Sequence, residues 1–221
     1  LKAVRVKLEP NQIQPVSFDI LFEGAVPAWL EEREDRRDLH GYRRNADQIR
    51  YHQTGTAEGW AEVNGERIRI SADSWVSTRD HSWGVRQDVG VPLTDLEPSE
   101  IETLVPSILA IWNPILFERK NGSRYAFFHY YLEYRGPGFK QARCQGGFEY
   151  PDGSRSLITS ERPEIRFDAR NMRFLGGKFT FTMGDGASRT LEYEPANDTG
   201  FHLGAGLYHG GLGQHQGSWR G

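Results

Sequence analysis

The stretch Thr78–Arg86, Thr-Arg-Asp-His-Ser-Trp-Gly-Val-Arg, holds the densest set of chemically capable side chains in the chain. Successive side chains of an extended strand point to opposite faces. We therefore predict that Arg79, His81 and Trp83 share one face and that Asp80 lies on the other. One face would carry a proton carrier beside an electron-rich ring. The opposite face would carry a carboxylate that orients its neighbours.

A structural role explains the same residues. A buried pair of Arg79 and Asp80 would tie two segments together. Trp83 would then belong to the core, and His81 would be a hydrogen-bonded core histidine. Paired and perturbed polar groups are often structural, so the residues alone leave both interpretations open.

A second polar segment is His129–Arg135, His-Tyr-Tyr-Leu-Glu-Tyr-Arg. Alternation places four polar side chains on one face of this strand: His129, Tyr131, Glu133 and Arg135. A face of this kind either points at water or lines a polar cavity, and both interpretations stay open.

Three histidines occur in the glycine-rich stretch Gly200–Gly221, namely His202, His209 and His215. Their spacings of seven and six residues match no common zinc-binding pattern. The chain also lacks a dinucleotide-binding glycine motif, a phosphate-binding loop and a Gly-x-Ser-x-Gly elbow. We therefore predict no metal and no cofactor, and we interpret this stretch as strands at a cavity mouth.

The segment Asp80–Arg86, Asp-His-Ser-Trp-Gly-Val-Arg, resembles the Asp-(His/Arg)-x-Trp-Gly signature of the AttH and carotenoid 1,2-hydratase superfamily, which includes kievitone hydratase. The preceding Glu58–Gly65 resembles the lead-in to that signature, and the distal Gly210–Gly221 also resembles the superfamily. The resemblance implies a fold of two lipocalin-like β domains. It says less about the reaction, because function lives in sites rather than in folds.

The same resemblance implies a set of site residues. Superfamily hydratases carry a tyrosine and an acidic residue two positions apart on a later strand. Tyr131-x-Glu133 is similar to that pair, with glutamate in place of aspartate. The implied catalytic set is His81, Trp83, Tyr131, Glu133 and Asp80.

If both strands face one cavity, hydration of a lipophilic alkene follows as a mechanism. An apolar barrel raises the pKa of a carboxylic acid, so Glu133 or Asp80 could stay protonated and donate the proton. The Trp83 ring would stabilise the cation, and His81 would hold or activate water. A non-catalytic binder of a hydrophobic small molecule, and a scaffold in which the motif only joins two domains, are the alternative hypotheses.

Four dipeptides of hairpin type predict an antiparallel β meander: Asn64-Gly65, Asn121-Gly122, Asp152-Gly153 and Asp185-Gly186. Alternation also predicts strands over residues 2–8 and 16–23. Such meanders close into lipocalin-like barrels or stack into sandwiches. We expect an all-β protein with two β domains, the end of a first over residues 1–77 and a second over residues 78–221, as part of a longer chain.

The charged run Glu31–Asp38 predicts a solvated loop or a short surface helix rather than a binding lid. A capping box at Ser99 and Glu102 predicts one helical turn before Pro106.

Composition excludes several classes of protein. The 221 residues carry a net charge of −3 and offer no basic field for nucleic acid. A mean hydropathy of −0.65 with no long apolar run argues against a membrane span, and we expect a soluble chain, cytoplasmic rather than secreted. A single cysteine, Cys144, permits no internal disulfide. The expected partner is a lipophilic small molecule, and the oligomeric state is left open.

Overall fold

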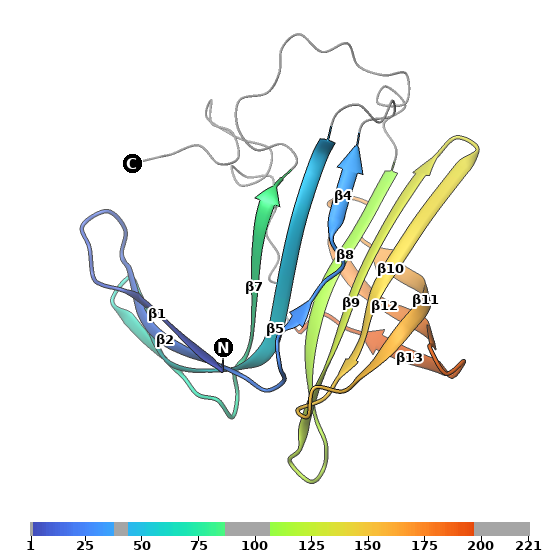
Figure 1. Cartoon of the computed structure of the whole chain (residues 1–221). Helices are drawn as coiled ribbons and strands as arrows, with labels where there is room; N and C mark the ends of the chain where they lie inside the picture. Colours follow the sequence, from blue (N-terminus) through green and yellow to red (C-terminus); the bar gives the residue numbers. More distant parts are fainter. Residues whose placement is uncertain (1, 38–43, 87–106, 197–221) are drawn as a thin grey trace.

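The computed structural model describes residues 2–37, 44–86 and 107–196, which form thirteen strands and no helix (Figure 1). The predicted all-β antiparallel fold is confirmed. Seven strands make the first sheet: β1 (Ala3–Leu8), β2 (Val16–Gly24), β3 (Trp29–Leu30), β4 (Glu34–Arg37), β5 (Arg44–Val63), β6 (Glu66–Ile70) and β7 (Val76–Val85). Six strands make the second: β8 (Ser107–Glu118), β9 (Arg124–Gly136), β10 (Phe139–Glu149), β11 (Arg155–Phe167), β12 (Phe174–Met183) and β13 (Ser188–Tyr193).

The first sheet is built around β5, whose 20 residues pair with five other strands. β2, β3 and β4 follow one another along one edge, and β6 and β7 along the other. Figure 1 shows that β5 bends, so that β1, β2 and β6 swing away from the second sheet. Gly55 and Gly59 permit the tight pairing at this bend, because a Cβ at either position would lie about 2 Å from a carbonyl oxygen of β2, 1.9 Å and 2.1 Å respectively.

All four predicted hairpin turns are present, in two geometries. Asn64 and Gly65 form a two-residue turn with φ angles of 53° and 83°. In the other three turns the asparagine or aspartate side chain instead accepts a hydrogen bond from the backbone N–H two residues on: Asn121, Asp152 and Asp185. The glycine after each of these residues takes the positive φ that closes the loop.

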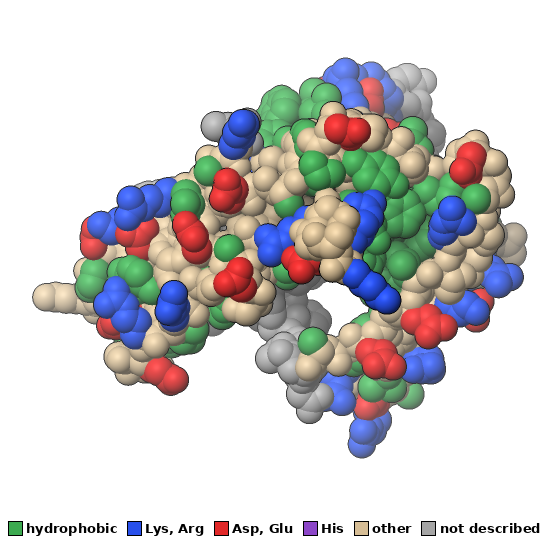
Figure 2. Space-filling model, turned by 90° about the horizontal axis from the view of Figure 1, so that it is seen from below, with side chains coloured by type: hydrophobic (Ala, Val, Ile, Leu, Met, Phe, Trp, Pro, Cys, Tyr) green, Lys and Arg blue, Asp and Glu red, His purple; other side chains and the backbone are tan. Residues whose placement is uncertain are grey.

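The second sheet curls around its own hydrophobic core. The strand order is β13-β12-β11-β10-β9-β8, and the core cluster consists of Phe127, Ile158, Phe179, Phe181 and Met183. Seen from below, hydrophobic side chains line a hollow on the side of β8–β13, whereas charges of both signs cover the lobe of β1, β2 and β6 (Figure 2).

The two sheets meet back to back, so each curls away from the other. His52 of β5 stacks on Phe128 of β9 with 3.8 Å between ring centroids. Side chains of the second sheet also bind backbone atoms around β3. Gln145 accepts a hydrogen bond from the N–H of Glu32 at 3.0 Å, and Arg155 donates one to the Ala28 carbonyl at 3.3 Å.

Two predictions need correction. The boundary predicted between residues 77 and 78 falls inside β7, which pairs with β5 over ten residues and so belongs to the first sheet. Within the charged run, residues 34–37 form β4 rather than a loop or helix, and Glu34 and Arg36 point toward the second sheet. There the Arg36 guanidinium donates to the Tyr134 hydroxyl at 3.3 Å.

The helical turn predicted at residues 98–102 lies outside the described residues. Within the described ranges, no helix has the length and apolar character needed to cross a membrane.

Candidate functional site

One face of the first sheet is apolar and incompletely covered. Phe18, Ile20 and Phe22 of β2 pair with odd-numbered residues of β5 and therefore share their face. The strands on either side add Val4, Val6, Leu8, Ile68 and Ile70. This surface, named here the concave face, lies inside the bend of β5 and points away from the second sheet. Val6 is 52% exposed and Ile68 is 40% exposed, whereas Phe22 and Ile70 are each only 5% exposed.

An aromatic cluster adjoins this apolar surface where β5 and β7 pair. Cross-strand register places His81 opposite Tyr51 and Trp83 opposite Ile49. The Tyr51 and His81 rings stack at 5.5 Å, and the Trp83 ring lies 5.7 Å from His81 and 6.3 Å from Tyr51. Trp83 remains 48% exposed. The prediction that His81 and Trp83 share one face agrees with this geometry, whereas their partner Tyr51 was missed.

Arg79 lies between the apolar surface and the aromatic cluster. Its Nε and Nη2 donate to Gln53 Oε1 at 3.0 and 2.7 Å, and its Nη1 donates to the Tyr51 hydroxyl at 3.3 Å. Gln53 is buried and donates in turn to the Val26 carbonyl at 2.8 Å. The guanidinium carbon lies 5.6 Å from the centre of the Phe22 ring. Within the described residues, no carboxylate pairs with Arg79.

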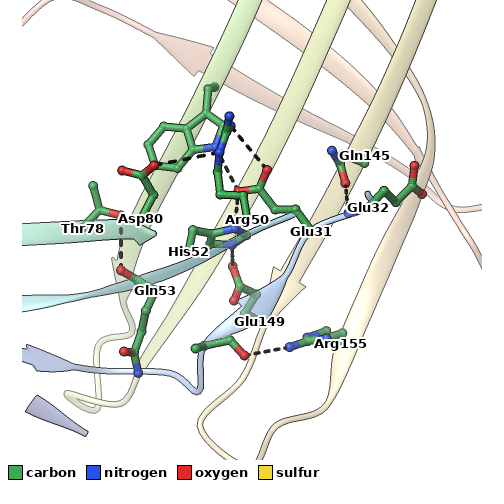
Figure 3. Close-up of polar contacts among 12 residues, drawn as sticks. Glu31, Glu32, Arg50, His52, Gln53, Thr78, Asp80, Gln145, Glu149 and Arg155 are labelled. Carbon is green, nitrogen blue, oxygen red and sulfur yellow. Dashed lines mark hydrogen bonds and ion pairs between the residues drawn. The ribbon is translucent and has the colours of Figure 1, made fainter. Parts of the chain in front are cut away.

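Asp80 lies on the opposite face of β7, as alternation predicts, and belongs to the junction between the sheets (Figure 3). Its Oδ2 is 3.9 Å from Nε of Arg50, whose Nη1 is 3.6 Å from Glu31 Oε2. One interpretation of the sequence paired Asp80 with Arg79. That assignment needs correction for Arg79, because Arg79 points to the concave face and Arg50 of the neighbouring strand approaches Asp80 instead.

The junction itself is centred on His52, which is fully buried. Its Nδ1 lies 3.1 Å from Glu31 Oε1 and its Nε2 lies 3.0 Å from Glu149 Oε1 (Figure 3). Burial alone would lower the pKa of His52, but the hydrogen bonds to Glu149 and Glu31 outweigh burial and raise it. Both ring nitrogens face carboxylates, and only the imidazolium form of His52 can donate a hydrogen bond from each of them. Sequence reasoning missed this triad, whose members come from both sheets.

Tyr131 and Glu133 do lie together, on the concave side of the second sheet. The Tyr131 hydroxyl and Arg135 Nε both donate to the Glu133 carboxylate, and Lys140 Nζ lies 2.8 Å from it. Burial tends to raise the pKa of Glu133, but Lys140, Tyr131 and Arg135 lower it to about 2. The expectation of a protonated acid at Glu133 is therefore wrong, because two cations surround the carboxylate where an apolar wall was expected.

His129 shares the concave side of the second sheet and forms a buried network that the sequence indicated only in part. Its Nδ1 lies 3.0 Å from Glu161 Oε1, and its Nε2 lies 3.0 Å from the Tyr193 hydroxyl. The side chains of His129 and Glu161 have no exposed surface. Phe179 and Phe181 pack edge-on against the imidazole. This arrangement fits a hydrogen-bonded core histidine.

The five predicted catalytic residues thus occupy three places. His81 and Trp83 lie on the concave face of the first sheet, Asp80 at the junction, and Tyr131 with Glu133 in the second sheet. Within the described residues, no hydrogen bond, ion pair or ring contact joins the first pair to the last. A catalytic role for the set stays a prediction.

A polar groove opens at the junction, on the side of β5 that His81 and Trp83 do not face. The groove is open to solvent. Its lining includes Arg50, Tyr130, Arg143 and Cys144. Burial raises the pKa of the Cys144 thiol to about 11, so this cysteine stays protonated and is a poor nucleophile.

Within the described residues, no group of histidine, cysteine, aspartate and glutamate side chains is arranged to hold a metal ion. His202, His209 and His215 lie outside the described residues.

The fold and its surfaces define an all-β protein in which two curled antiparallel sheets pack back to back through a charged junction. The chain belongs to a family of unknown function, DUF8625, whose model matches residues 1–221. No curated protein and no solved structure is similar to the chain. The resemblance to the AttH and carotenoid 1,2-hydratase superfamily stays a prediction.

Proposed function

We propose that the protein binds a lipophilic small molecule on the concave face of the first sheet. The observation that carries the proposal is the Tyr51, His81 and Trp83 cluster, which lies half exposed beside a continuous apolar surface. Contiguous exposed apolar surface marks interaction sites. Tyrosine, histidine and tryptophan combine an apolar ring with a polar atom, and this suits a ligand that is mostly apolar.

The second sheet supports the choice of face by contrast. The centre of its concave side is packed by its own side chains, since Phe127 and Phe181 have no exposed surface. A ligand there would have to displace close-packed rings, which is costly. On the first sheet, by contrast, a ligand would contact side chains that are already exposed among the described residues, namely Val6, Ile68 and Trp83.

Hydration of an alkene is the second candidate function. The observation that favours it is the contact of the His81 imidazole with the Trp83 ring, which joins a base to a cation-stabilising surface. Neither Glu133 nor Asp80 lies on this face. A proton donor must therefore come from another group, and the Tyr51 hydroxyl is the one that lies in the cluster.

Titration with the neutral hydrophobic dye Nile red tests the binding proposal. The variant Trp83→Ala should bind the dye at least about tenfold more weakly, because loss of a large buried ring area costs more than 1.4 kcal/mol. Trp60→Ala is the matched control. Trp60 lies on β5, on the outer face of the same sheet, where the Arg67 guanidinium covers its ring at 3.9 Å. Thermal melts confirm that both variants fold.

Three outcomes would overturn the proposal. The dye does not bind the wild-type protein, or Trp83→Ala and Trp60→Ala bind it equally well, or sedimentation shows a dimer that Trp83→Ala dissociates. The last outcome would make the face a contact between two copies of the chain.

The hydratase candidate has a separate test. An isoprenoid alkene incubated in ¹⁸O-labelled water should yield a labelled alcohol, measured by mass spectrometry. His81→Ala should abolish the label while Nile red still binds. No labelled product with any of a panel of alkenes would remove the hydratase candidate and leave the binding proposal in place.

A further inference from the structure

We infer that the ligand of the concave face is an amphiphilic acid, a lipophilic chain that ends in a carboxylate bound by Arg79. The inference rests on the proposed function and names its class of ligand. Arg79 lies on the concave face at the boundary between the apolar surface and the aromatic cluster, within 5.6 Å of the Phe22 ring and 5.2 Å of the Tyr51 ring.

Among the described residues, the hydrogen bonds of Arg79 leave two N–H donors, both on its terminal nitrogens. A guanidinium carries five N–H groups. Gln53 and Tyr51 accept three of them, one from Nε, one from Nη1 and one from Nη2. Within the described residues, one N–H on each terminal nitrogen remains. Two parallel N–H groups are the pattern that a carboxylate accepts in a bidentate contact.

The neutral surroundings of Arg79 favour an anion. Its described partners are the amide of Gln53, the hydroxyl of Tyr51 and two aromatic rings, none of which carries charge. Asp80, the nearest acid along the chain, points to the opposite face and approaches Arg50. Any ligand that covers the concave face strips water from Arg79. A neutral ligand would leave a desolvated charge without compensation, a cation would be repelled, and a carboxylate would neutralise the charge.

The buried Gln53 supports the interpretation of Arg79 as a head-group site. Gln53 is 3% exposed and holds the guanidinium through two contacts to one oxygen, while its own amide is fixed on the Val26 carbonyl. A guanidinium held in this way loses little further freedom when it binds a planar anion.

The apolar surface gives the chain of the ligand its place. Phe22, Ile20 and Phe18 follow one another along β2 beyond Arg79. Four residues of strand span about 13 Å. A carboxylate at Arg79 therefore leaves a linear or isoprenoid chain lying along this row, flanked by Val6 of β1.

Competition against Nile red with decanoic acid, 1-decanol and decyl phosphate tests the inference, each kept below its aggregation concentration. Decanoic acid should displace the dye from the wild-type protein at a concentration at least about tenfold lower than 1-decanol, since the chains are equal and only the head group differs. Arg79→Met, which keeps the volume and removes the charge, should bring the ratio of the two close to one. Arg67→Met, on the outer face over Trp60, should leave the ratio unchanged.

The possible results distinguish a failure of the inference from a failure of the proposed function. Equal displacement by acid and alcohol from the wild-type protein overturns the carboxylate and leaves the binding face standing. Decyl phosphate tenfold better than decanoic acid overturns it in favour of a phosphate head group. Absence of Nile red binding removes the proposed function and the inference together. If Arg79→Met does not fold, salt dependence decides, because a preference for the acid that rests on Arg79 must weaken as sodium chloride rises. A preference that does not weaken overturns the inference.

Discussion

The concave faces of the two sheets are both formed by alternate side chains of antiparallel strands, but the side chains differ in how far they are buried. In the second sheet, six strands curl around phenylalanine rings that leave no surface exposed, and His129 is sealed among them. In the first sheet, the bend of β5 holds β1, β2 and β6 apart from β7, and Trp83 stays 48% exposed.

The difference lies in which side chains line each curve. The rings of Phe127, Phe179 and Phe181 form the core of the second sheet and need no polar partner. The first sheet instead places Tyr51, His81 and Trp83 at its centre, all of which carry a polar atom. Rings buried in the core of the second sheet stabilise the fold, whereas the exposed cluster of the first sheet belongs to the binding face that we propose.

The largest expected loss of stability comes from removing a ring from the core of the second sheet. Phe181→Ala should lower the free energy of unfolding by about 3–5 kcal/mol, because it leaves a cavity at a fully buried site. Trp83→Ala should lower it by less than about 1 kcal/mol, since nearly half of that side chain is already in water. Urea denaturation of both variants measures the difference. Equal losses would show that the first face is also core and would end the comparison.

A smaller effect is expected at the junction that joins the two sheets. Glu149→Gln should lower the free energy of unfolding by roughly 1–3 kcal/mol, since it weakens a buried charged hydrogen bond to His52. The pKa of His52 is raised above its ordinary 6.5 in the folded state. Its protonation therefore contributes stability that is complete below pH 6.5 and is lost as the pH rises through the folded pKa.

Denaturation curves across neutral and alkaline pH measure this contribution. The wild-type protein should lose stability as the pH rises, and Glu149→Gln should lose less. Glu58→Gln, at an exposed position of β5, is the control and should follow the wild type. Parallel curves for all three proteins would mean that His52 does not carry the proton.

The smallest effect is expected at Glu133, whose partners Arg135 and Lys140 are more than half exposed. Its pKa is lowered from 4.5 to about 2. The carboxylate therefore adds stability that is present above pH 4.5 and is lost as the pH falls toward 2. Glu133→Gln should lower the free energy of unfolding by roughly 1 kcal/mol at neutral pH. It should also make the loss of stability below pH 4.5 less steep.

Acid denaturation measures this loss, with Glu192→Gln at an exposed position of β13 as the control. Nile red binding should be the same in Glu133→Gln and in the wild-type protein, because the binding face that we propose lies on the other sheet. Loss of dye binding in Glu133→Gln would indicate that the ligand binds on the concave side of the second sheet instead.

The sequence predicts local features of this fold well. Turn dipeptides and alternation depend on neighbouring residues, so the four hairpins, β1 and β2 could all be placed, and His81 could be assigned to the same face as Trp83. Alternation does not say what each face meets. That depends on the pairing of β7 with β5, which joins residues about 30 positions apart, such as His81 and Tyr51.

Long-range contacts account for the features that the sequence did not predict. His52 and Glu149 are 97 residues apart, and no local pattern joins them. The charged run around Glu34 has the composition of a solvated segment, yet the edge pairing of β4 with β5 turns Glu34 and Arg36 toward the second sheet. Glu133 looked like an acid in an apolar barrel, because the approach of Lys140 depends on the register of β9 with β10.

Strand β5 contributes side chains both to the concave face and to the junction, and this has a thermodynamic consequence. Tyr51 faces the proposed ligand and His52 faces two carboxylates, and the two residues are joined by a single peptide bond. If a ligand that orders the Tyr51 ring shifts the proton affinity of His52, the proton must shift the ligand affinity by the same factor, since binding linkage is reciprocal. The chemical shift of the His52 ring, titrated with and without ligand, measures that coupling from the proton's side alone.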